Sequence, residues 1–477
     1  MQTLVESPLE KALMNVFLQQ KSKVKELRTE SSGNRIERLK QLRNWIHSNR
    51  SQIHEAMYSD FKKHPVEVDG IEIFHVLSEI KTAISNLELW ASPKKIDAPI
   101  TMLGTKSYIQ YEPRGVCLIL APWNYPFSLC AGPLVSALAA GNSVILKPSE
   151  FTPHVSSVLK RMAEEVFDAA VVSIFEGDAE VSQKLLKLPF DHIFFTGSPS
   201  VGKLVMKAAA ENLASVTLEL GGKSPSIITD SASLKDAAQR TAVAKFVNNG
   251  QTCVAPDYVL VDEKIVDRFT TLLTDQIKNL FTENNTSFAQ SEHYCRIIND
   301  KHFVRLNELL NETLEQGARV LFGGEIDRST RFMHPTILTK VPHSSRIMSE
   351  EIFGPILPVI VYNNLDEAIA FVNARPKPLA LYIFSGRKKE QERILRETSA
   401  GGVCINDCGI HFLHHNLPFG GVNNSGMGKS HGHYGFLAFS NEKPVLKQRR
   451  GLTTIRAFYP PYTARSKKIM EWFLRLF

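Results

Sequence analysis

Residues 192–220, HIFFTGSPSVGKLVMKAAAENLASVTLEL, contain an apolar run, a glycine-containing loop, a helical segment and a second apolar run. The runs at 192–197 and 216–220 have the length of buried β-strands, and apolar residues from Val205 to Ala209 mark a helix between them. A strand, a helix and a further strand in this order are typical of a βαβ unit, which joins two parallel strands. The stretch therefore predicts a parallel sheet covered by helices.

The same alternation extends in both directions from this unit. Before it, apolar runs lie at 116–121, 143–149 and 171–175; after it, others lie at 226–229, 258–261, 356–362 and 380–385. Residues 34–60 instead have helical spacing of apolar side chains, and the first hundred residues are expected to be mainly helical. The chain is therefore predicted to form two α/β domains.

One long uncharged stretch resembles a membrane span. Gly115 to Leu146 holds 32 residues without a charge, more than the roughly 20 that a membrane helix needs. Pro122, Pro126 and Pro133 interrupt it, so it is predicted to form a buried strand, loop, helix and strand.

Charge and cysteine content exclude several classes of protein. The net charge is +7, but residues 443–477 alone carry nine basic side chains and one acid, so the rest of the chain is nearly neutral, unlike a nucleic-acid-binding protein. Six cysteines in 477 residues do not make a disulfide scaffold and suit a reducing compartment. The start, MQTLVESPLE, has no basic segment before an apolar run, so no secretory signal is expected and a cytoplasmic location is predicted.

Three polar residues stand where α/β proteins carry functional groups. Cys253 follows the turn-rich stretch 248–250, where a thiol can be exposed and nucleophilic; the alternative is a packing cysteine. Glu219 ends a strand before two glycines, where burial would raise its pKa and suit it to a general base; the alternative is a solvated carboxylate or a pair with Lys223. Asn124, held between prolines and aromatic residues, can donate to an oxyanion, or it is a turn asparagine.

Two segments at strand ends are candidates for holding a nucleotide. Lys147 and Glu150 can bind a ribose, or they lie in a solvated loop. The loop from Gly197 to Gly202 precedes a helix and matches a phosphate-binding P-loop as far as its lysine, but the Mg²⁺-binding Ser or Thr is replaced by Leu204. The sequence therefore disfavours a P-loop NTPase, whereas a helix N-terminus facing a cofactor pyrophosphate remains attractive.

The spacing of Cys404 and Cys408 is a weak zinc signal, because no second pair accompanies them. His411, His414 and His415 follow, yet a structural or substrate-lining loop is favoured and no metal is predicted.

Taken together, the motifs resemble the aldehyde dehydrogenase superfamily. They are PWNYP, KPSE, FTGS, LELGGKSP, GQTC, EEIFGP and PFGG, in the order of that family, over about residues 35–450. The segments GQTCVAPDY and YEPRGV are similar to the class 3 branch, which includes fatty and aromatic aldehyde dehydrogenases.

The resemblance implies a role for each candidate residue. Cys253 would be the nucleophile, Glu219 the base, and Asn124 with the backbone N–H of Cys253 the oxyanion hole. The cofactor would be NAD or NADP. Lys147 and Glu150 would contact its adenosine ribose, and Gly197, Ser198 and Gly202 its pyrophosphate. Glu351 and Phe353 would contact the nicotinamide ribose and ring.

The resemblance also implies an aldehyde dehydrogenase-like α/β fold and its reaction. A Rossmann-type cofactor domain would comprise 1–94 and 114–218, a catalytic α/β domain 219–419, and a small β extension for pairing subunits 95–113 and 420–450. An aldehyde, expected to be medium- or long-chain aliphatic or aromatic, would be oxidised to the acid through a thioester. The implied assembly is a homodimer. A non-catalytic protein on this fold is the alternative, against which Cys253, Glu219 and Asn124 argue.

Two positions depart from the family pattern. Pro199 and Ser200 replace Thr and Gly in the loop that the resemblance places at the pyrophosphate, and they are expected to restrict this loop. Asn423 stands where glycine is usual, and because asparagine tolerates a positive φ, the turn is expected to survive.

The basic tail, 451–477, ends in KKIMEWFLRLF. Eleven residues are too few to span a bilayer, but residues 464–477 have the pattern of an interfacial helix with basic flanks. Peripheral membrane contact is one hypothesis, and packing on its own subunit or on a dimer mate is the other.

Overall fold

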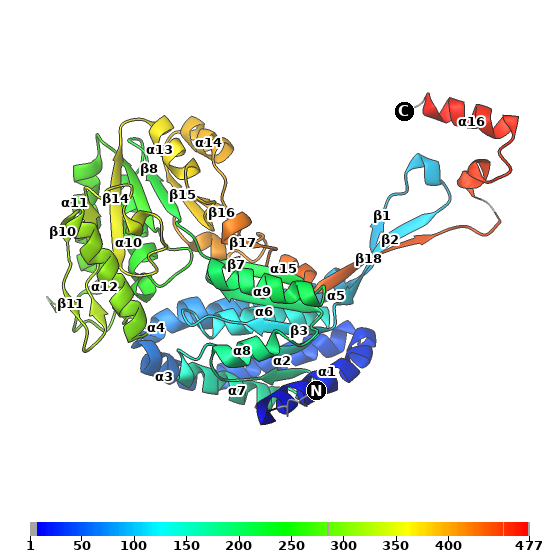
Figure 1. Ribbon diagram of the computed structural model, residues 1–477, viewed down its shortest axis with the longest axis horizontal. Coiled ribbons are helices and arrows are strands. Elements are labelled where there is room, and N and C mark those ends of the chain that lie inside the picture. Colours follow the sequence, from blue (N-terminus) through cyan, green and yellow to red (C-terminus); the bar gives the residue numbers. More distant parts are fainter. Residues whose placement is uncertain (1–6, 284–285, 452, 476–477) are drawn as a thin grey trace, which may run out of the picture.

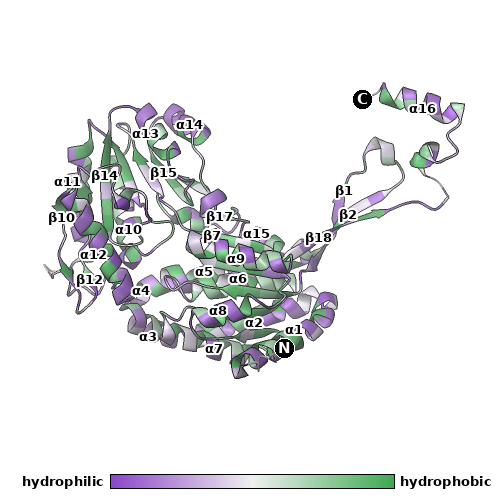
Figure 2. Ribbon diagram, in the orientation of Figure 1, coloured by the Kyte–Doolittle hydropathy of each residue, from purple (hydrophilic) through white to green (hydrophobic). Residues whose placement is uncertain are grey.

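A computed structural model describes residues 7–283, 286–451 and 453–475. It contains two bodies, each built on a mainly parallel sheet, and a thin arm that projects from one of them and bears the C-terminal helix at its end (Figure 1). In Figure 2 the inner strands, such as β14, are mainly hydrophobic, whereas the outer helices carry both hydrophilic and hydrophobic residues.

The N-terminal region is helical, as predicted. Its helices are α1 (Pro8–Thr29), α2 (Ser32–Ser48), α3 (Arg50–Phe61), α4 (Pro65–Glu67) and α5 (Phe74–Ala91). The helical spacing over 34–60 belongs to two helices, because the backbone leaves helical geometry at Asn49, with φ −110° and ψ 16°.

The first sheet contains the βαβ unit of residues 192–220. Its order is β17-β7-β6-β3-β4-β5, and all neighbours are parallel except β17 with β7. The strands are β3 (Val116–Leu120), β4 (Ser143–Lys147), β5 (Val172–Ile174), β6 (His192–Gly197), β7 (Ser215–Leu220) and β17 (Gly426–Met427); the helices between them are α6 (Ser128–Ala140), α7 (Pro153–Val166), α8 (Ala179–Leu185) and α9 (Pro199–Glu211). The uncharged stretch 115–146 is thus β3, a loop, α6 and β4, as predicted; the two strands are buried, and residues 121–123 of the loop are half-buried.

The second sheet has the order β10-β13-β14-β9-β8-β15-β16, with only β10 antiparallel. Its strands are β8 (Pro225–Ile228), β9 (Tyr258–Asp262), β10 (Arg319–Phe322), β13 (Thr336–Thr339), β14 (Ile356–Tyr362), β15 (Ala380–Phe384) and β16 (Gly402–Ile405). The helices are α10 (Leu234–Phe246), α11 (Val266–Phe281), α12 (Asp300–Glu315), α13 (Leu365–Asn373) and α14 (Lys388–Glu397), and a small hairpin joins β11 (Ile326–Asp327) to β12 (Phe332–Met333). The four strands predicted for this region are all present.

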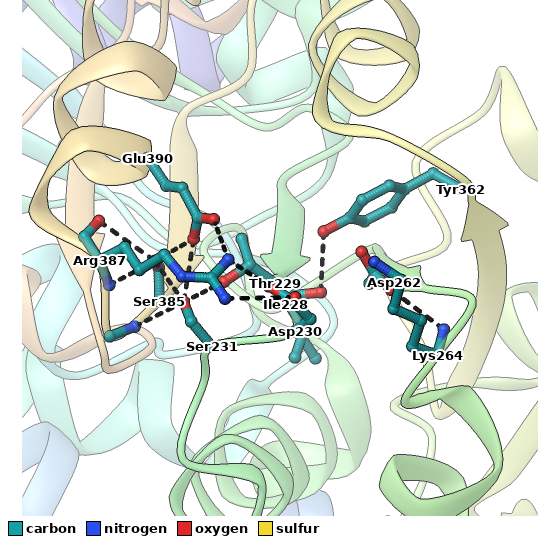
Figure 3. Close-up of polar contacts among 11 residues, drawn as sticks. Ile228, Thr229, Asp230, Ser231, Asp262, Lys264, Tyr362, Ser385, Arg387 and Glu390 are labelled. Carbon is teal, nitrogen blue, oxygen red and sulfur yellow. Dashed lines mark hydrogen bonds and ion pairs between the residues drawn. The ribbon is translucent and has the colours of Figure 1, made fainter.

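The carboxyl edge of the second sheet is closed by polar side chains (Figure 3). The loops after β8 and β15 meet there, and Arg387 Nη1 lies 2.7 Å from Asp230 Oδ1, while Ser231 Oγ donates to Glu390 Oε2 at 2.9 Å. The neighbouring strands β8 and β15 connect in opposite directions along the sheet, β8 to β9 on one side and β15 to β16 on the other. Ligands of open α/β sheets usually bind at the carboxyl edge of such a point. At this edge the polar side chains bond to one another.

The arm is a three-stranded antiparallel sheet of β1 (Lys94–Ile96), β2 (Lys106–Pro113) and β18 (Ser440–Lys447). The predicted extension, 95–113 and 420–450, is wider than this sheet: β17 pairs with β7, and α15 (Gly432–Ala438) packs on α5 and α6. Beyond the arm, α16 spans Ala464–Leu474. The segment before β18 stays on the first body because its apolar residues, such as Phe436, are buried there.

Candidate active site

A cavity of about 530 Å³ lies between the two bodies. The first sheet contributes loops at its carboxyl edge, after β3, β6 and β7, and the second sheet contributes loops at its amino edge, before β8, β9, β14 and β15. Seven of the predicted site residues line it: Asn124, Gly197, Ser198, Glu219, Cys253, Glu351 and Phe353. The structure therefore brings together candidates that span more than two hundred residues of sequence.

Cys253 is half-buried in the loop before β9. The preceding residues Asn248 and Asn249 are buried and have φ of 52° and 55°, the left-handed region that asparagine tolerates best. Burial raises the pKa of the Cys253 thiol, and the nearby Glu351 and Glu219 raise it further, while its own backbone N–H opposes the shift. Burial and the neighbouring carboxyl groups therefore favour the protonated thiol over the reactive thiolate.

Asn124 lies in the loop after β3 and is almost fully buried. Its Nδ2 donates to the carbonyl oxygen of Gln251 at 3.1 Å, and its own carbonyl oxygen accepts from Asn248 Nδ2 at 2.9 Å. A further hydrogen bond of 2.7 Å joins Tyr125 Oη to Thr252 Oγ1. The loop of Asn124 and the loop of Cys253 are thus tied together directly.

A fully buried ion pair, Lys63 with Glu72, is hydrogen-bonded to the Asn124 loop. Lys63 Nζ donates to Glu72 Oε1 at 3.2 Å and to the carbonyl oxygen of Asn124 at 3.3 Å, and both side chains are 0% exposed. The other oxygen of Glu72 accepts from the backbone N–H of Ser128 at 2.8 Å. Sequence reasoning missed both residues, because they lie in the helical N-terminal region without a motif.

Glu219 is the penultimate residue of β7, and both of its carboxylate oxygens accept hydrogen bonds. Ser430 Oγ donates to Oε1, and Thr196 Oγ1 donates to Oε2 at 3.3 Å. Burial raises the pKa of Glu219 to about 7, although these hydrogen bonds and the charge of Lys429 lower it. The alternative of a pair with Lys223 is wrong.

Lys223 instead ties three loops together on the second body. Its Nζ donates to Asp257 and to the carbonyl oxygens of Ile347 and Glu350, at 2.7 and 3.0 Å for the two carbonyls. The segment 347–353 is thereby fixed at the cavity, with Glu351 accepting from the backbone N–H of Gly222. Burial raises the pKa of Glu351 to about 8.

Aromatic rings form one wall of the cavity. Phe353 has φ of 50°, which is unusual for a bulky residue, and its ring centroid lies 5.3 Å from that of Trp123. The ring of His302, on α12, lies 4.8 Å from Trp123. Trp123 was visible in the PWNYP motif, whereas His302 carries no sequence signal, because only the packing of α12 brings it here.

The start of α9 faces the cavity through Gly197, Ser198 and Ser200. Pro199 is the first residue of the helix and Ser198 is its N-cap, accepting from the backbone N–H of Val201 at 3.4 Å. Proline is well suited to this position because its missing N–H would be unpaired there in any case. The departure at Pro199 is therefore compatible with the helix N-terminus.

Three predicted residues lie at this edge but do not line the cavity. Lys147 Nζ donates to Glu150 Oε2 at 2.8 Å, so the two candidates for the ribose pair with each other. Gly202 lies in α9 against β7, where a Cβ atom would come within 2.7 Å of Leu220 Cδ2. A larger residue at this position would therefore push the Leu220 side chain aside.

The remaining candidates lie elsewhere. Cys404 is half-buried and Cys408 is buried, and within the described residues no group of three metal-ligating side chains comes together. Asn423 has φ of 53°, which confirms that asparagine supports the turn at that position.

Comparison with known proteins agrees with this geometry. Residues 11–445 match the model of the aldehyde dehydrogenase family. The 4,4'-diaponeurosporen-aldehyde dehydrogenase of Staphylococcus aureus is 47% identical over 92% of this chain and 94% of its own length. Aldehyde dehydrogenase family 3 member A2 of Mus musculus is 42% identical over 92% of this chain and 90% of its own length.

A solved structure gives the same result for the fold. The substrate-bound state of Staphylococcus aureus AldH superimposes with a TM-score of 0.92 at 45% identity, covering 97% of this chain and 99% of that one. The predicted α/β fold and enzyme class are confirmed by these matches, and the P-loop NTPase alternative is set aside. The chain belongs to the aldehyde dehydrogenase family.

Proposed function

We propose that this aldehyde dehydrogenase uses NAD or NADP to oxidise an apolar aldehyde to its carboxylic acid, with Cys253 as nucleophile, Asn124 as oxyanion donor and Glu219 as general base. The observation that carries the proposal is that these three side chains, from three separate loops, line one cavity. A nucleophile, an oxyanion donor and a base in one cleft are the groups that acyl transfer requires.

In the first step the Cys253 thiol would lose its proton to water, and the thiolate sulfur would then bond to the aldehyde carbon as the carbonyl π bond breaks. The aldehyde oxygen then becomes anionic and would accept hydrogen bonds from Asn124 Nδ2 and the backbone N–H of Cys253. Asn124 is suited to this role because its amide carries two hydrogens, one of which already donates to Gln251 and fixes the orientation. The nicotinamide supplies the acceptor for the hydride that leaves this carbon, and an acyl thioester remains on Cys253.

Several groups of the cavity fit a dinucleotide. The N-terminus of α9 opens into it, which suits the negative charge of a pyrophosphate. Glu351 and Phe353 would hold the nicotinamide ribose and ring beside Cys253. Lys147 and Glu150 remain our candidates for the adenosine ribose at the same edge of the sheet.

Water would complete the reaction. Its oxygen bonds to the thioester carbon, one of its protons passes to Glu219, and the carbon–sulfur bond breaks to release the acid and the Cys253 thiolate. A carboxyl with a pKa of about 7 is well matched to this task near neutral pH.

The test of the proposal is a panel of aldehydes, from short aliphatic to long-chain and aromatic, assayed with each cofactor and with identification of the product. Glu219→Gln should accumulate a thioester on Cys253 that mass spectrometry detects. Rapid turnover in that variant would refute the assigned base, and absence of acid product from every aldehyde would refute the reaction.

The proposed substrate class rests on the apolar core beside the nucleophile and on the name of one relative. Cys253 packs against an apolar cluster that includes Val254, Tyr382 and Phe419. The Staphylococcus aureus relative is named for 4,4'-diaponeurosporen-aldehyde. We therefore expect medium- or long-chain aliphatic and aromatic aldehydes to react better than short ones.

We propose that the arm pairs two subunits into a homodimer. Within the described residues no strand pairs with the outer edges of β1 and β18, and Ile96 and Leu446 on these strands are exposed. An exposed apolar edge strand is a template for pairing with another chain. Light scattering should show a dimer for the full chain and a shift toward monomer for Leu446→Lys.

The C-terminal helix is our candidate for peripheral membrane contact. On α16, Trp472 and Leu474 are 60% and 70% exposed, and Lys467 and Lys468 flank them. Residues 476–477 of the predicted segment lie outside the described residues. None of the described helices has the length and apolarity to cross a membrane.

Co-sedimentation with anionic liposomes tests this contact. The full chain should bind and a chain truncated after Thr463 should not; equal binding of both would discard the idea. A cytoplasmic location stays a prediction.

A further inference from the structure

The carboxylate of Glu219 is held by a segment that follows it by about two hundred residues. Strand β17 pairs antiparallel with β7, with Gly426 opposite Glu219, and Phe419 bridges to Ser430. This register brings Ser430 beside Glu219, and its hydroxyl donates to Oε1. The two elements lie side by side in Figure 1.

Glu219 stands in a wall between two cavities. In front is the cavity that contains Cys253; behind is a cavity of about 10 Å³ lined by Ser430, His431, His75, Glu79 and Ser128, among others. Glu219 lines both, whereas Ser430 lines the rear one and Thr196 the front one. The carboxylate is therefore held from both sides, by one hydroxyl on each oxygen.

We propose that Ser430 is a positioning residue for thioester hydrolysis: its hydroxyl fixes the orientation of the Glu219 carboxylate and stabilises its anionic form. This inference rests on the proposed base role of Glu219. Ser430 does not line the front cavity, and its hydroxyl otherwise bonds only the carbonyl oxygen of Phe419 among the described residues, so its effect on the front cavity would pass through Glu219.

The burial of the pair supports this role. Ser430 is 5% exposed and Glu219 is 5% exposed, so water does not readily replace a lost hydrogen bond. A hydroxyl that donates to a carboxylate favours the charged form, and Ser430 is the largest influence that lowers the pKa of Glu219 against the effect of burial.

The other titratable groups around Glu219 lie on every side. Lys429 is on the segment of Ser430, and Cys253 and Glu351 face the front cavity, whereas His75, Glu79 and His431 surround the rear one. Burial lowers the pKa of His75 to about 4, so His75 is neutral between pH 6 and 9, and burial lowers the pKa of His431 as well. Glu79, with a pKa of about 7, titrates in the same range, so its contribution needs a control of its own.

The experiment compares Ser430→Ala, Ser430→Thr and Ser440→Ala in the full-length protein. Ser440 is the matched control, because it is also buried and, in the part of the chain that the structure describes, its hydroxyl bonds only the carbonyl oxygen of Phe436, at 2.6 Å. For each variant we would measure kcat against pH with a reactive aldehyde and saturating cofactor, and the steady-state fraction of enzyme carrying the thioester. Glu79→Gln identifies any inflection that belongs to Glu79.

Ser430→Ala should move the acidic inflection of kcat upward by about one pH unit, since a hydrogen bond to a charged group is worth about that much. At pH 6 this is a loss of about tenfold in kcat, with a larger thioester fraction and an unchanged KM for the cofactor. Ser430→Thr, which keeps the hydroxyl, and Ser440→Ala should follow the wild-type profile.

An unchanged inflection in Ser430→Ala would overturn the proposal, and so would a Ser430→Thr profile that matches the alanine variant. If Ser430→Ala does not fold, Thr196→Val removes the hydrogen bond to the other oxygen and must shift the inflection in the same direction. Glu219→Gln distinguishes a failure of the proposed base from a failure of the proposed positioning residue. Rapid hydrolysis in Glu219→Gln refutes the base role of Glu219. An accumulated thioester in Glu219→Gln, together with a wild-type pH profile for Ser430→Ala, refutes only the role of Ser430.

Discussion

Replacing Glu219 with glutamine should make the protein more stable at alkaline pH while it stops hydrolysis. Burial raises the pKa of this carboxyl from 4.5 to about 7 in the folded protein. The folded state therefore binds the proton more tightly than the unfolded state, so stability falls as pH rises from about 4.5 to about 7. The total effect above pH 7 is roughly 3 kcal/mol, at 1.36 kcal/mol per pKa unit. Glutamine carries no charge and avoids this cost.

Urea unfolding at pH 5 and pH 8 measures the difference. Glu219→Gln should have nearly wild-type stability at pH 5 and should be more stable by about 2–3 kcal/mol at pH 8. Its amide oxygen can still accept from Ser430, so the packing of the site is kept. Glu211→Gln, at an exposed glutamate near the end of α9, is the control and should show no such pH dependence.

A variant whose stability relative to wild type is the same at both pH values would refute the reasoning. It would mean that Glu219 is solvated or paired in the folded protein, contrary to its 5% exposure. A variant less stable at pH 8 would reverse the sign and would show that the carboxylate is stabilised by more than its burial costs.

Further substitutions test other parts of the site. Cys253→Ala should abolish aldehyde oxidation and leave cofactor binding, measured by calorimetry, unchanged; residual oxidation would remove Cys253 from the nucleophile role. Asn124→Ala should lower kcat by about 10²–10³, the usual effect of losing an oxyanion donor, and a smaller change than tenfold would contradict its role. Lys63→Met leaves Glu72 buried without its partner and should destabilise the protein by about 3–5 kcal/mol in urea unfolding, whereas wild-type stability would show that the pair is dispensable.

Much of the fold follows from local patterns in the sequence. The apolar runs around residues 192–220 gave the right strands because a parallel strand is buried on both faces and needs a continuous apolar run. The turn at Asn423 was also predictable, because tolerance of a positive φ is a property of the residue itself. The predicted extension 420–450 was too wide. Strand β18, residues 440–447, joins the arm sheet, whereas residues 426–438 pack on the first body.

The sequence by itself determined the strands, the helices and the chemical types of residue that stand at the strand ends, because these depend on neighbours within a few positions. The tertiary structure alone decided which of them share a cavity and in what electrostatic setting. Lys63 reaches the carbonyl of Asn124, and Ser430 reaches Glu219, only through packing of distant segments. The thiol of Cys253 is likewise disfavoured as a thiolate by burial and by two carboxyls that lie far from it in sequence. Desolvation and charge act through space, so no local pattern along the chain carries them.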